Sequence, residues 1–159
     1  PRTPSEARQS MIANAIAARN AYGSPVIVVD FGTATNIDVV DGRGAYRGGA
    51  ISPGLMLSAN ALFSKAAKLA SIPVEAPEHA LGDTTETAMQ SGLVIGAAAQ
   101  AEGLVSRMKA ELGIEQAKVI GTGGLARTVS RATDLFDAVD PTLTLRGIRE
   151  IWLQQYGGA

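Results

Sequence analysis

The apolar residues change their period along the chain, and this change constrains the fold more than any other feature of the sequence. Residues 26–31 read Val-Ile-Val-Val-Asp-Phe, a β-branched run that is typical of a buried strand. Alternating polarity over residues 36–40 predicts a second strand, and the turn at 41–44 predicts a third strand over 45–49. We therefore expect a meander of three strands.

Helical spacing of apolar residues surrounds this meander. Ser5 is the predicted N-cap of the first helix, and Thr84 or Thr85 can cap a long later one. A further short strand at 118–120 runs into a glycine-rich segment, and residues 71–84 are predicted to be a loop. Because strands and helices alternate, we expect an α/β fold with a mixed sheet. The predicted helices cover residues 6–22, 55–69, 85–112, 125–131 and 141–156.

The amino-acid composition excludes several kinds of catalytic group and binding partner. The 159 residues are 46% hydrophobic, which suffices for one domain over residues 1–159 with its own core. Fourteen basic against fifteen acidic residues leave no broad cationic surface, so nucleic acid is not expected as a partner. The chain has no cysteine and a single histidine, His79, which excludes thiol nucleophiles and zinc clusters. Catalysis would have to use carboxylates, hydroxyls, backbone amides or a hard metal ion.

The sequence contains no membrane signal. No apolar run approaches the roughly 18 residues that a membrane span needs. The amino end is polar and has no hydrophobic block before a small-residue cleavage site. We therefore expect a soluble cytoplasmic protein without a membrane partner.

The most specific local motif is Asp30-Phe31-Gly32-Thr33-Ala34-Thr35, between the first two predicted strands. The Asp30 carboxylate could ligate a cation, and Gly32 permits a tight turn. The hydroxyls of Thr33 and Thr35 could face the same mouth and donate to phosphate oxygens. An ordinary hairpin turn, in which these polar groups satisfy the backbone, is the alternative interpretation.

A second glycine-rich motif, Gly121-Thr122-Gly123-Gly124-Leu125-Ala126, follows a predicted strand and precedes a helix. Its amides could bind a phosphate, or its backbone could lie against an adenosine. The motif also fits a dinucleotide fingerprint, but the about 33 residues that follow are too few for the further βα units of a dinucleotide domain. A purely structural turn remains the other interpretation.

Taken in order, five segments resemble the carboxyl-terminal half of type III pantothenate kinases. The resemblance implies a ribonuclease-H-like mixed sheet with flanking helices, one lobe of the sugar-kinase, actin and heat-shock ATPase superfamily. It also implies ATP-dependent phosphorylation of pantothenate in coenzyme A synthesis, by a dimer that needs Mg²⁺ and a monovalent cation, K⁺ or NH₄⁺. The segments are Val-Val-Asp-Phe-Gly-Thr-Ala-Thr (28–35), Gly-Gly-Ala-Ile-Ser-Pro-Gly (48–54), Gly-Asp-Thr-Thr with Ala-Met-Gln-Ser-Gly (82–92), Gly-Thr-Gly-Gly-Leu-Ala (121–126) and Asp-Pro-Thr-Leu-Thr-Leu-Arg-Gly (140–147).

The resemblance also implies roles for individual residues. Asp30 would ligate the monovalent cation and Thr33 would touch the ATP phosphates, while Thr35 is a cofactor-binding candidate from the hydroxyls of the same motif. Thr85 would hold pantothenate. The adenosine side would be lined by Gly121, Thr122, Gly123 and Gly124.

Two features depart from the family pattern. Family members carry an amino-terminal lobe with a phosphate loop, and this chain has no such segment. Ser10 and Met11 stand where the family has its catalytic aspartate and its substrate-gripping arginine. A serine cannot act as that base near neutral pH without an activating group, and methionine cannot pair with a carboxylate. We therefore assign no catalytic base to this chain.

Three hypotheses follow from these departures. The chain could be one subunit of a two-chain kinase, a heterodimer in which the partner carries the phosphate-loop lobe and the base. It could be a degenerate pseudokinase that serves as a regulatory or assembly module, or a fragment of a longer polypeptide. We favour the first, with a homodimer as its variant and the small residues of the 85–112 helix as the candidate subunit contact. A dinucleotide-binding enzyme is the remaining alternative.

Overall fold

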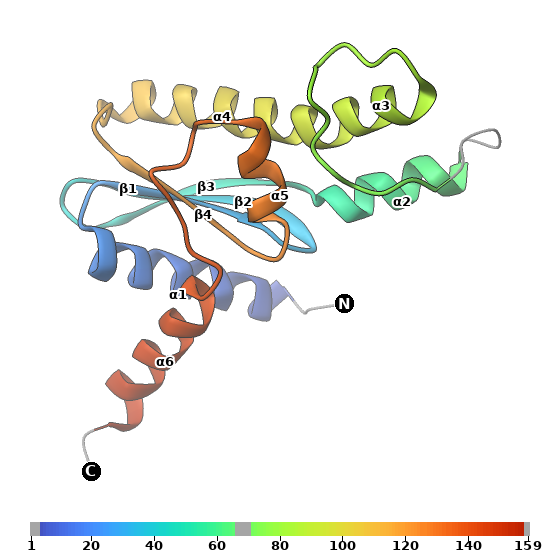
Figure 1. The fold of residues 1–159 in the computed structure, drawn as a ribbon. Coiled ribbons are helices and arrows are strands. Elements are labelled where there is room, and N and C mark those ends of the chain that lie inside the picture. The colour runs from blue at the N-terminus through green and yellow to red at the C-terminus, as the bar shows by residue number, and fades with distance from the viewer. Residues whose placement is uncertain (1–3, 66–70, 158–159) are drawn as a thin grey trace.

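The computed structural model describes residues 4–65 and 71–157, which form a five-stranded mixed sheet between helices (Figure 1). The strand order is β3-β2-β1-β4-β5. The pairs β1–β2 and β2–β3 are antiparallel, whereas β1–β4 and β4–β5 are parallel. The strands are β1 (Val26–Phe31), β2 (Ala34–Val40), β3 (Tyr46–Pro53), β4 (Lys118–Thr122) and β5 (Ala138–Val139).

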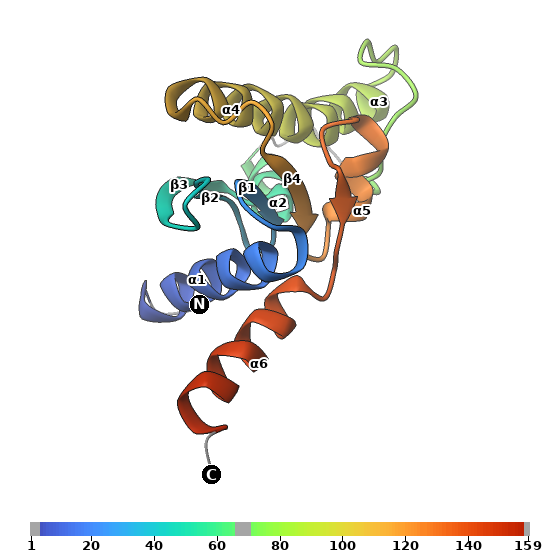
Figure 2. The ribbon, with the colours of Figure 1, turned by 90° about the vertical axis from the view of Figure 1, so that its left-hand side faces the viewer.

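Helices cover both faces of this sheet (Figures 1 and 2). Helix α1 lies on one face, and a long helical run composed of α3, a π-helical turn and α4 lies over the other. The described helices are α1 (Pro4–Tyr22), α2 (Leu55–Lys65), α3 (Thr85–Gln90), the π-helical turn (Ser91–Ile95), α4 (Gly96–Leu112), α5 (Ala126–Val129), a 3₁₀ turn (Ser130–Ala132) and α6 (Leu143–Tyr156).

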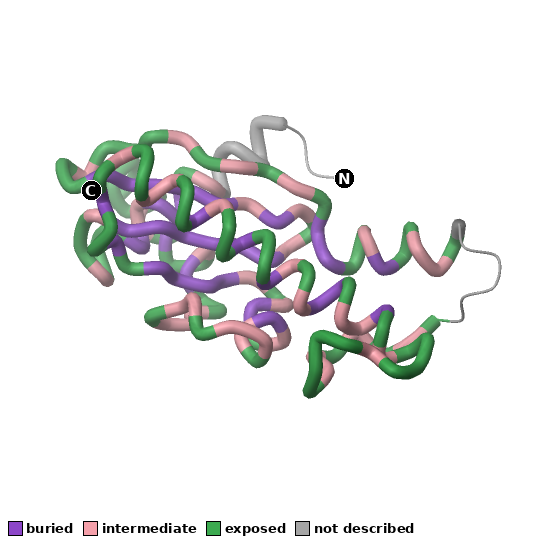
Figure 3. The backbone as a smooth tube through the Cα atoms, turned by 90° about the horizontal axis from the view of Figure 1, so that it is seen from above, coloured by how far each residue is buried: buried purple, intermediate pink, exposed green. Residues whose placement is uncertain are grey.

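The central strand β1 is buried on both faces, as its continuous apolar sequence predicts. Ile27, Val29 and Phe31 belong to the core beneath α4, whereas Val26 and Val28 pack with the alanines of α1. Each such side chain contributes roughly 1.5–3 kcal/mol when it is fully buried. Buried positions follow the central strands, and the outer helix faces are exposed (Figure 3). Asp30, at the end of this strand, points to the α1 side by the same alternation.

Helix α6 crosses α1 at a glycine. A Cβ at Gly147 would stand 2.0 Å from the carbonyl oxygen of Ala13, so only glycine permits this approach of the two helices. Beyond the crossing, α6 runs away from the sheet (Figures 1 and 2). Its large apolar side chains there are exposed, among them Trp152 and Tyr156, whose ring centroids are 6.0 Å apart.

Most predicted elements are present, with shifted ends. Helix α1 begins at Pro4, so Ser5 lies inside the first turn and the prediction that it is the N-cap is wrong. The predicted end of the second helix at residue 69 falls outside the described residues. Thr84, not Thr85, caps α3, and the predicted 125–131 helix is one α-helical turn followed by a 3₁₀ turn. None of the described helices is long and apolar enough to cross a membrane.

Candidate functional site

Two chain segments meet at the carboxyl ends of the parallel strands β1 and β4. Asp30 and Thr122 are partners in the β1–β4 register. The turn after β1 is closed by the Gly32 amide, which donates to the Ala34 carbonyl across 3.1 Å. The loop after β4 is tied to the same place, because the Leu125 amide donates to the Phe31 carbonyl across 3.3 Å. Ligands of open α/β sheets bind at such carboxyl edges.

Gly123 forms the closest contact between the two segments. Its φ of +91° favours glycine, and a Cβ there would lie 2.5 Å from Asp30 Oδ1 and 2.7 Å from the Phe31 carbonyl oxygen. The missing side chain therefore lets the loop lie directly against a carboxylate oxygen and a carbonyl oxygen, and we call this close contact the cradle. Oxygens of these two kinds are the ligands that hard cations prefer.

A third segment, the end of β3, closes on the turn from the other side. A Cβ at Gly54 would lie 2.2 Å from the Thr33 carbonyl oxygen, so the backbone before α2 is in direct contact with the turn. The Thr33 side chain itself is exposed. The turn is thus fixed through its backbone while its hydroxyl stays available to a ligand.

Asn14 of α1 contacts the Asp30 carboxylate from the face of the sheet that α1 covers. Its Nδ2 donates to Asp30 Oδ2 across 3.0 Å, and the two residues are 1% and 9% exposed. Its Oδ1 is buried and has no hydrogen-bond partner in the described part of the chain. A hydrogen bond to a charged group of this kind fixes orientation well. Sequence reasoning did not select Asn14 as a site residue, although an amide on the alanine-rich buried face of a helix was a usable signal.

A second acid, Asp38, lies on the same face of the sheet and is fully buried. Its Oδ1 accepts a hydrogen bond from the Tyr46 hydroxyl across 3.0 Å, and its Oδ2 has no partner among the described residues. Burial raises the pKa of Asp38 to about 6; the Tyr46 hydrogen bond opposes the rise and the charge of Asp30 adds to it. No motif in the sequence marks Asp38 as a site residue.

Of the four predicted adenosine-side residues, only two lie open to a ligand. Gly124 is exposed and Gly123 is partly exposed. Gly121 and Thr122 are buried: the Gly121 carbonyl accepts from the Asp140 amide across 2.8 Å, and Thr122 Oγ1 donates to the Asp140 carbonyl across 2.7 Å. These two residues anchor the strand instead of facing the mouth.

Thr35 does not join Asp30. It pairs with Phe31 across the β1–β2 ladder, so the alternation of the strand turns it to the α4 face, opposite to Asp30. There it lines a cavity of about 260 Å³ with Gly92, Gly96 and Gln100. The expectation that both threonine hydroxyls share one mouth with Asp30 therefore fails for Thr35.

The remaining predicted residues lie elsewhere. Thr85 is exposed at the start of α3, and its hydroxyl makes no hydrogen bond within the described part of the chain. The side chain of Ser10, the residue at the family's base position, is outside the described side chains. The structure thus brings together Asp30, Thr33, Gly123 and Gly124, with Asn14 behind them.

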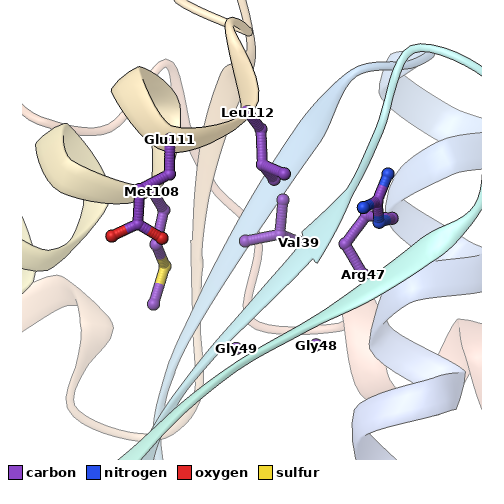
Figure 4. A pocket seen from close by; sticks show the side chains of 7 residues that line it. All are labelled: Val39, Arg47, Gly48, Gly49, Met108, Glu111 and Leu112. Carbon is purple, nitrogen blue, oxygen red and sulfur yellow. The ribbon is translucent and has the colours of Figure 1, made fainter.

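Another hollow, of about 230 Å³, lies between β3 and the end of α4 (Figure 4). Val39, Met108 and Leu112 give it apolar walls, with Glu111 on one side and Arg47 on the other. Arg47 already pairs with Asp41 across 3.1 Å. No predicted site residue lines this hollow.

The described side chains offer a metal ion few ligands in any one place. In residues 4–65 and 71–157 no three acidic, histidine or cysteine side chains gather into a metal site. A divalent cation therefore finds no complete protein cage there. Asp30 Oδ1 and the Phe31 carbonyl oxygen are the oxygen donors that lie together beside Gly123.

Solved structures share the fold. A Baf family protein from Campylobacter jejuni, described as a transcriptional activator, superposes with a TM-score of 0.65 at 22% identity, covering 91% of this chain and 65% of that one. The activator of the 2-hydroxyisocaproyl-CoA dehydratase from Clostridium difficile, solved with ADPNP, gives a TM-score of 0.51 at 12% identity, covering 94% and 69%. The predicted mixed α/β sheet with flanking helices is confirmed.

Sequence relatives are closer. Type III pantothenate kinases from Agathobacter rectalis and Geobacillus kaustophilus are 45% and 47% identical to the chain over 152 and 149 residues, or 96% and 94% of its length. The chain spans 58% and 57% of those two relatives. The family model for type III pantothenate kinases matches residues 3–107. The chain therefore belongs to the type III pantothenate kinase family.

Proposed function

We propose that this chain is a single-domain half of a kinase that phosphorylates pantothenate with ATP, and that it works with a partner lobe or chain in the cytoplasm. The observation that carries the proposal is the cradle at Gly123, where the loop after β4 touches Asp30 and the Phe31 carbonyl. Family membership supports the substrate pair. The partner would supply the phosphate loop and the base, in a heterodimer or as the other half of a longer polypeptide.

Each residue of the site has a positioning task, because phosphoryl transfer depends mainly on alignment and charge neutralisation. Asn14 donates to Oδ2 of Asp30, and Oδ1 lies beside the cradle. Asp30 Oδ1 and the Phe31 carbonyl would hold K⁺ or NH₄⁺, which would supply positive charge near the phosphates. Thr33 and Gly124 are exposed, and their hydroxyl and backbone would meet phosphate and adenosine.

Two components are assigned to the partner. The described acidic side chains form no divalent site, so Mg²⁺ would be held by the ATP phosphates and by the partner lobe. Ser10 and Met11 offer neither a carboxylate base nor a guanidinium. Thr85, exposed at the start of α3, would contribute a hydroxyl to pantothenate only in the assembled enzyme.

A pseudokinase is the second candidate, and the same two positions favour it. Without the base and the arginine, a chain that keeps the fold could regulate or assemble a complex without transferring a phosphate. Size-exclusion chromatography with candidate partners separates the two ideas. A kinase subunit requires a partner that bears a phosphate loop, whereas a regulator can form a stable homodimer alone.

The decisive experiment is a kinase assay with ATP, pantothenate, Mg²⁺ and NH₄⁺. It compares the isolated chain with the material that co-purifies with it from its native host. We expect activity only in the co-purified sample, and its loss on Asp30→Ala. The matched control is Asp134→Ala, since that carboxylate is exposed and makes no hydrogen bond or ion pair within the described residues. No phosphorylation in either sample, from a folded protein, would exclude the kinase.

A further inference from the structure

Asp140 makes hydrogen bonds to three elements, β4, α1 and α6, close to the loop that contains Gly123. It follows β5 and precedes α6, and its carboxylate side chain is 11% exposed. Oδ2 accepts a hydrogen bond from the Tyr22 hydroxyl across 3.0 Å and from the guanidinium of Arg146. Oδ1 accepts from the Thr142 amide across 3.0 Å and from its hydroxyl across 2.8 Å. One side chain thus gathers α1, by its last residue, and the first turns of α6.

The backbone of Asp140 is bonded to the end of β4 at the same time. Its amide donates to Gly121 and its carbonyl accepts from Thr122, across 2.8 and 2.7 Å. Thr122 directly precedes Gly123, which is in contact with Asp30. Tyr22 is the last residue of helix α1. The same helix carries Asn14, which donates a hydrogen bond to Asp30. Asp140 therefore connects β4, which leads into Gly123, with α1, which contacts Asp30 through Asn14.

The charge state of Asp140 is consistent with its ion pair to Arg146. Burial opposes ionisation of Asp140, but hydrogen bonds from Thr142 and Tyr22 and the charge of Arg146 outweigh it and lower its pKa. The carboxylate is thus charged near neutral pH, and its hydrogen bonds are of the strong, charge-assisted kind.

We propose that Asp140 is a positioning residue that holds the loop after β4 against Asp30 by tying β4 to α1 and α6. The inference rests on the proposed function for its catalytic meaning, while its geometry can be tested without nucleotide. Alignment is costly to lose, since a displacement of about 1 Å in a catalytic site can reduce the rate on the order of a hundredfold.

The test uses the isosteric variant Asp140→Asn, which can keep one oxygen for Thr142 but presents an NH₂ group to the donors of Tyr22 and Arg146. Hydrogen exchange of the Leu125 amide reports on the loop, because this amide is bonded to Phe31. We expect it to exchange at least tenfold faster in the variant. The Ile37 amide, in the β1–β2–β3 part of the sheet, should stay within twofold.

Two further variants keep the outcome clear. Asp134→Asn, at an exposed position, should change neither amide. Tyr22→Phe removes one donor only and should give an intermediate acceleration at Leu125, which covers the case that Asp140→Asn does not fold. Equal acceleration at Leu125 and Ile37 would mean a loss of global stability without a positioning role, and would overturn the proposal. An unchanged Leu125 rate would overturn it as well.

The enzymatic arm separates this inference from the proposed function. In the active co-purified kinase, Asp140→Asn should raise KM for ATP at least fivefold and leave KM for pantothenate within twofold. If the wild-type complex shows no kinase activity but Leu125 responds as expected, the proposed function fails and the positioning role stands. If the complex is active and neither Leu125 exchange nor KM for ATP changes, only the positioning role fails.

Discussion

Asn14 donates a hydrogen bond from Nδ2 to Asp30 Oδ2 across 3.0 Å, in the interior between α1 and the sheet. Sixteen positions separate the two residues in the sequence, yet the contact engages Oδ2 while Oδ1 lies beside the cradle at Gly123. Losing this donor would leave part of the desolvation cost of the buried carboxylate uncompensated. The orientation of the Asp30 carboxylate is therefore set from α1.

Replacing Asn14 by alanine should destabilise the protein by about 1–3 kcal/mol, because it removes a hydrogen-bond donor from a buried charged acceptor. Urea unfolding followed by circular dichroism measures the change. Asn20→Ala is the matched control on the same helix: its amide bonds to Glu150 at the surface, so the loss should stay below about 0.5 kcal/mol. Equal losses in both variants would contradict the importance of the buried contact.

Gly123→Ala should disrupt the site locally. The new Cβ would fill the cradle 2.5 Å from Asp30 Oδ1, and a φ of +91° costs a residue other than glycine about 1–3 kcal/mol. In the active co-purified kinase we expect the stimulation by NH₄⁺ to disappear. Gly103→Ala in α4, outside the proposed site, is the control, since a Cβ there meets no atom within 4 Å. If NH₄⁺ stimulates the Gly123 variant as it does the wild type, the cradle is not the cation site.

Asp38 should make stability depend on pH in a defined window. Its pKa rises from 3.8 to about 6 on folding, so the folded state holds this proton more tightly than the unfolded state. The stabilisation is complete below about pH 4 and is lost as the pH rises through about 6, by up to about 3 kcal/mol. Above that window the buried carboxylate is charged, which the fold tolerates poorly.

Asp38→Asn should remove this pH dependence while its amide oxygen still accepts from Tyr46. The difference in unfolding free energy between variant and wild type is therefore expected to grow in favour of the variant from pH 4 to pH 8. Urea titrations at four pH values measure it, with Asp134→Asn as the exposed control. A difference that stays constant over this range would show that Asp38 does not take up a proton on folding.

The sequence predicts the fold better than it predicts the site, for a physical reason. The run Val26–Phe31 defines a strand from its own composition, and it is found with the predicted bounds. β5 is two residues long and owes its place to pairing with β4, so no local pattern announces it. The π-helical turn inside the long helix likewise leaves no mark in the apolar spacing.

The site depends on contacts between distant segments. Asp30 and Thr33 lie in one motif and were found together, whereas Thr35 was grouped with them although strand alternation turns it to the other face. The glycine motif at 121–124 was recognised as a unit, but two of its members anchor the strand and two face the mouth. Asn14 has no local pattern that names its partner.

Gly147→Ala offers a test of how α6 is mounted on α1. The added Cβ would lie 2.0 Å from the Ala13 carbonyl oxygen, and because that atom belongs to the backbone the two helices would have to move apart. We expect a loss of about 1–3 kcal/mol in unfolding free energy, the usual cost of overpacking. Gly103→Ala, in α4, is the matched control because its Cβ would meet nothing within 4 Å, and alanine should stabilise that helix by about 0.5–1 kcal/mol. Opposite signs for the two substitutions would establish Gly147 as the contact that lets α6 approach α1, whereas a stabilising Gly147→Ala would contradict the close crossing.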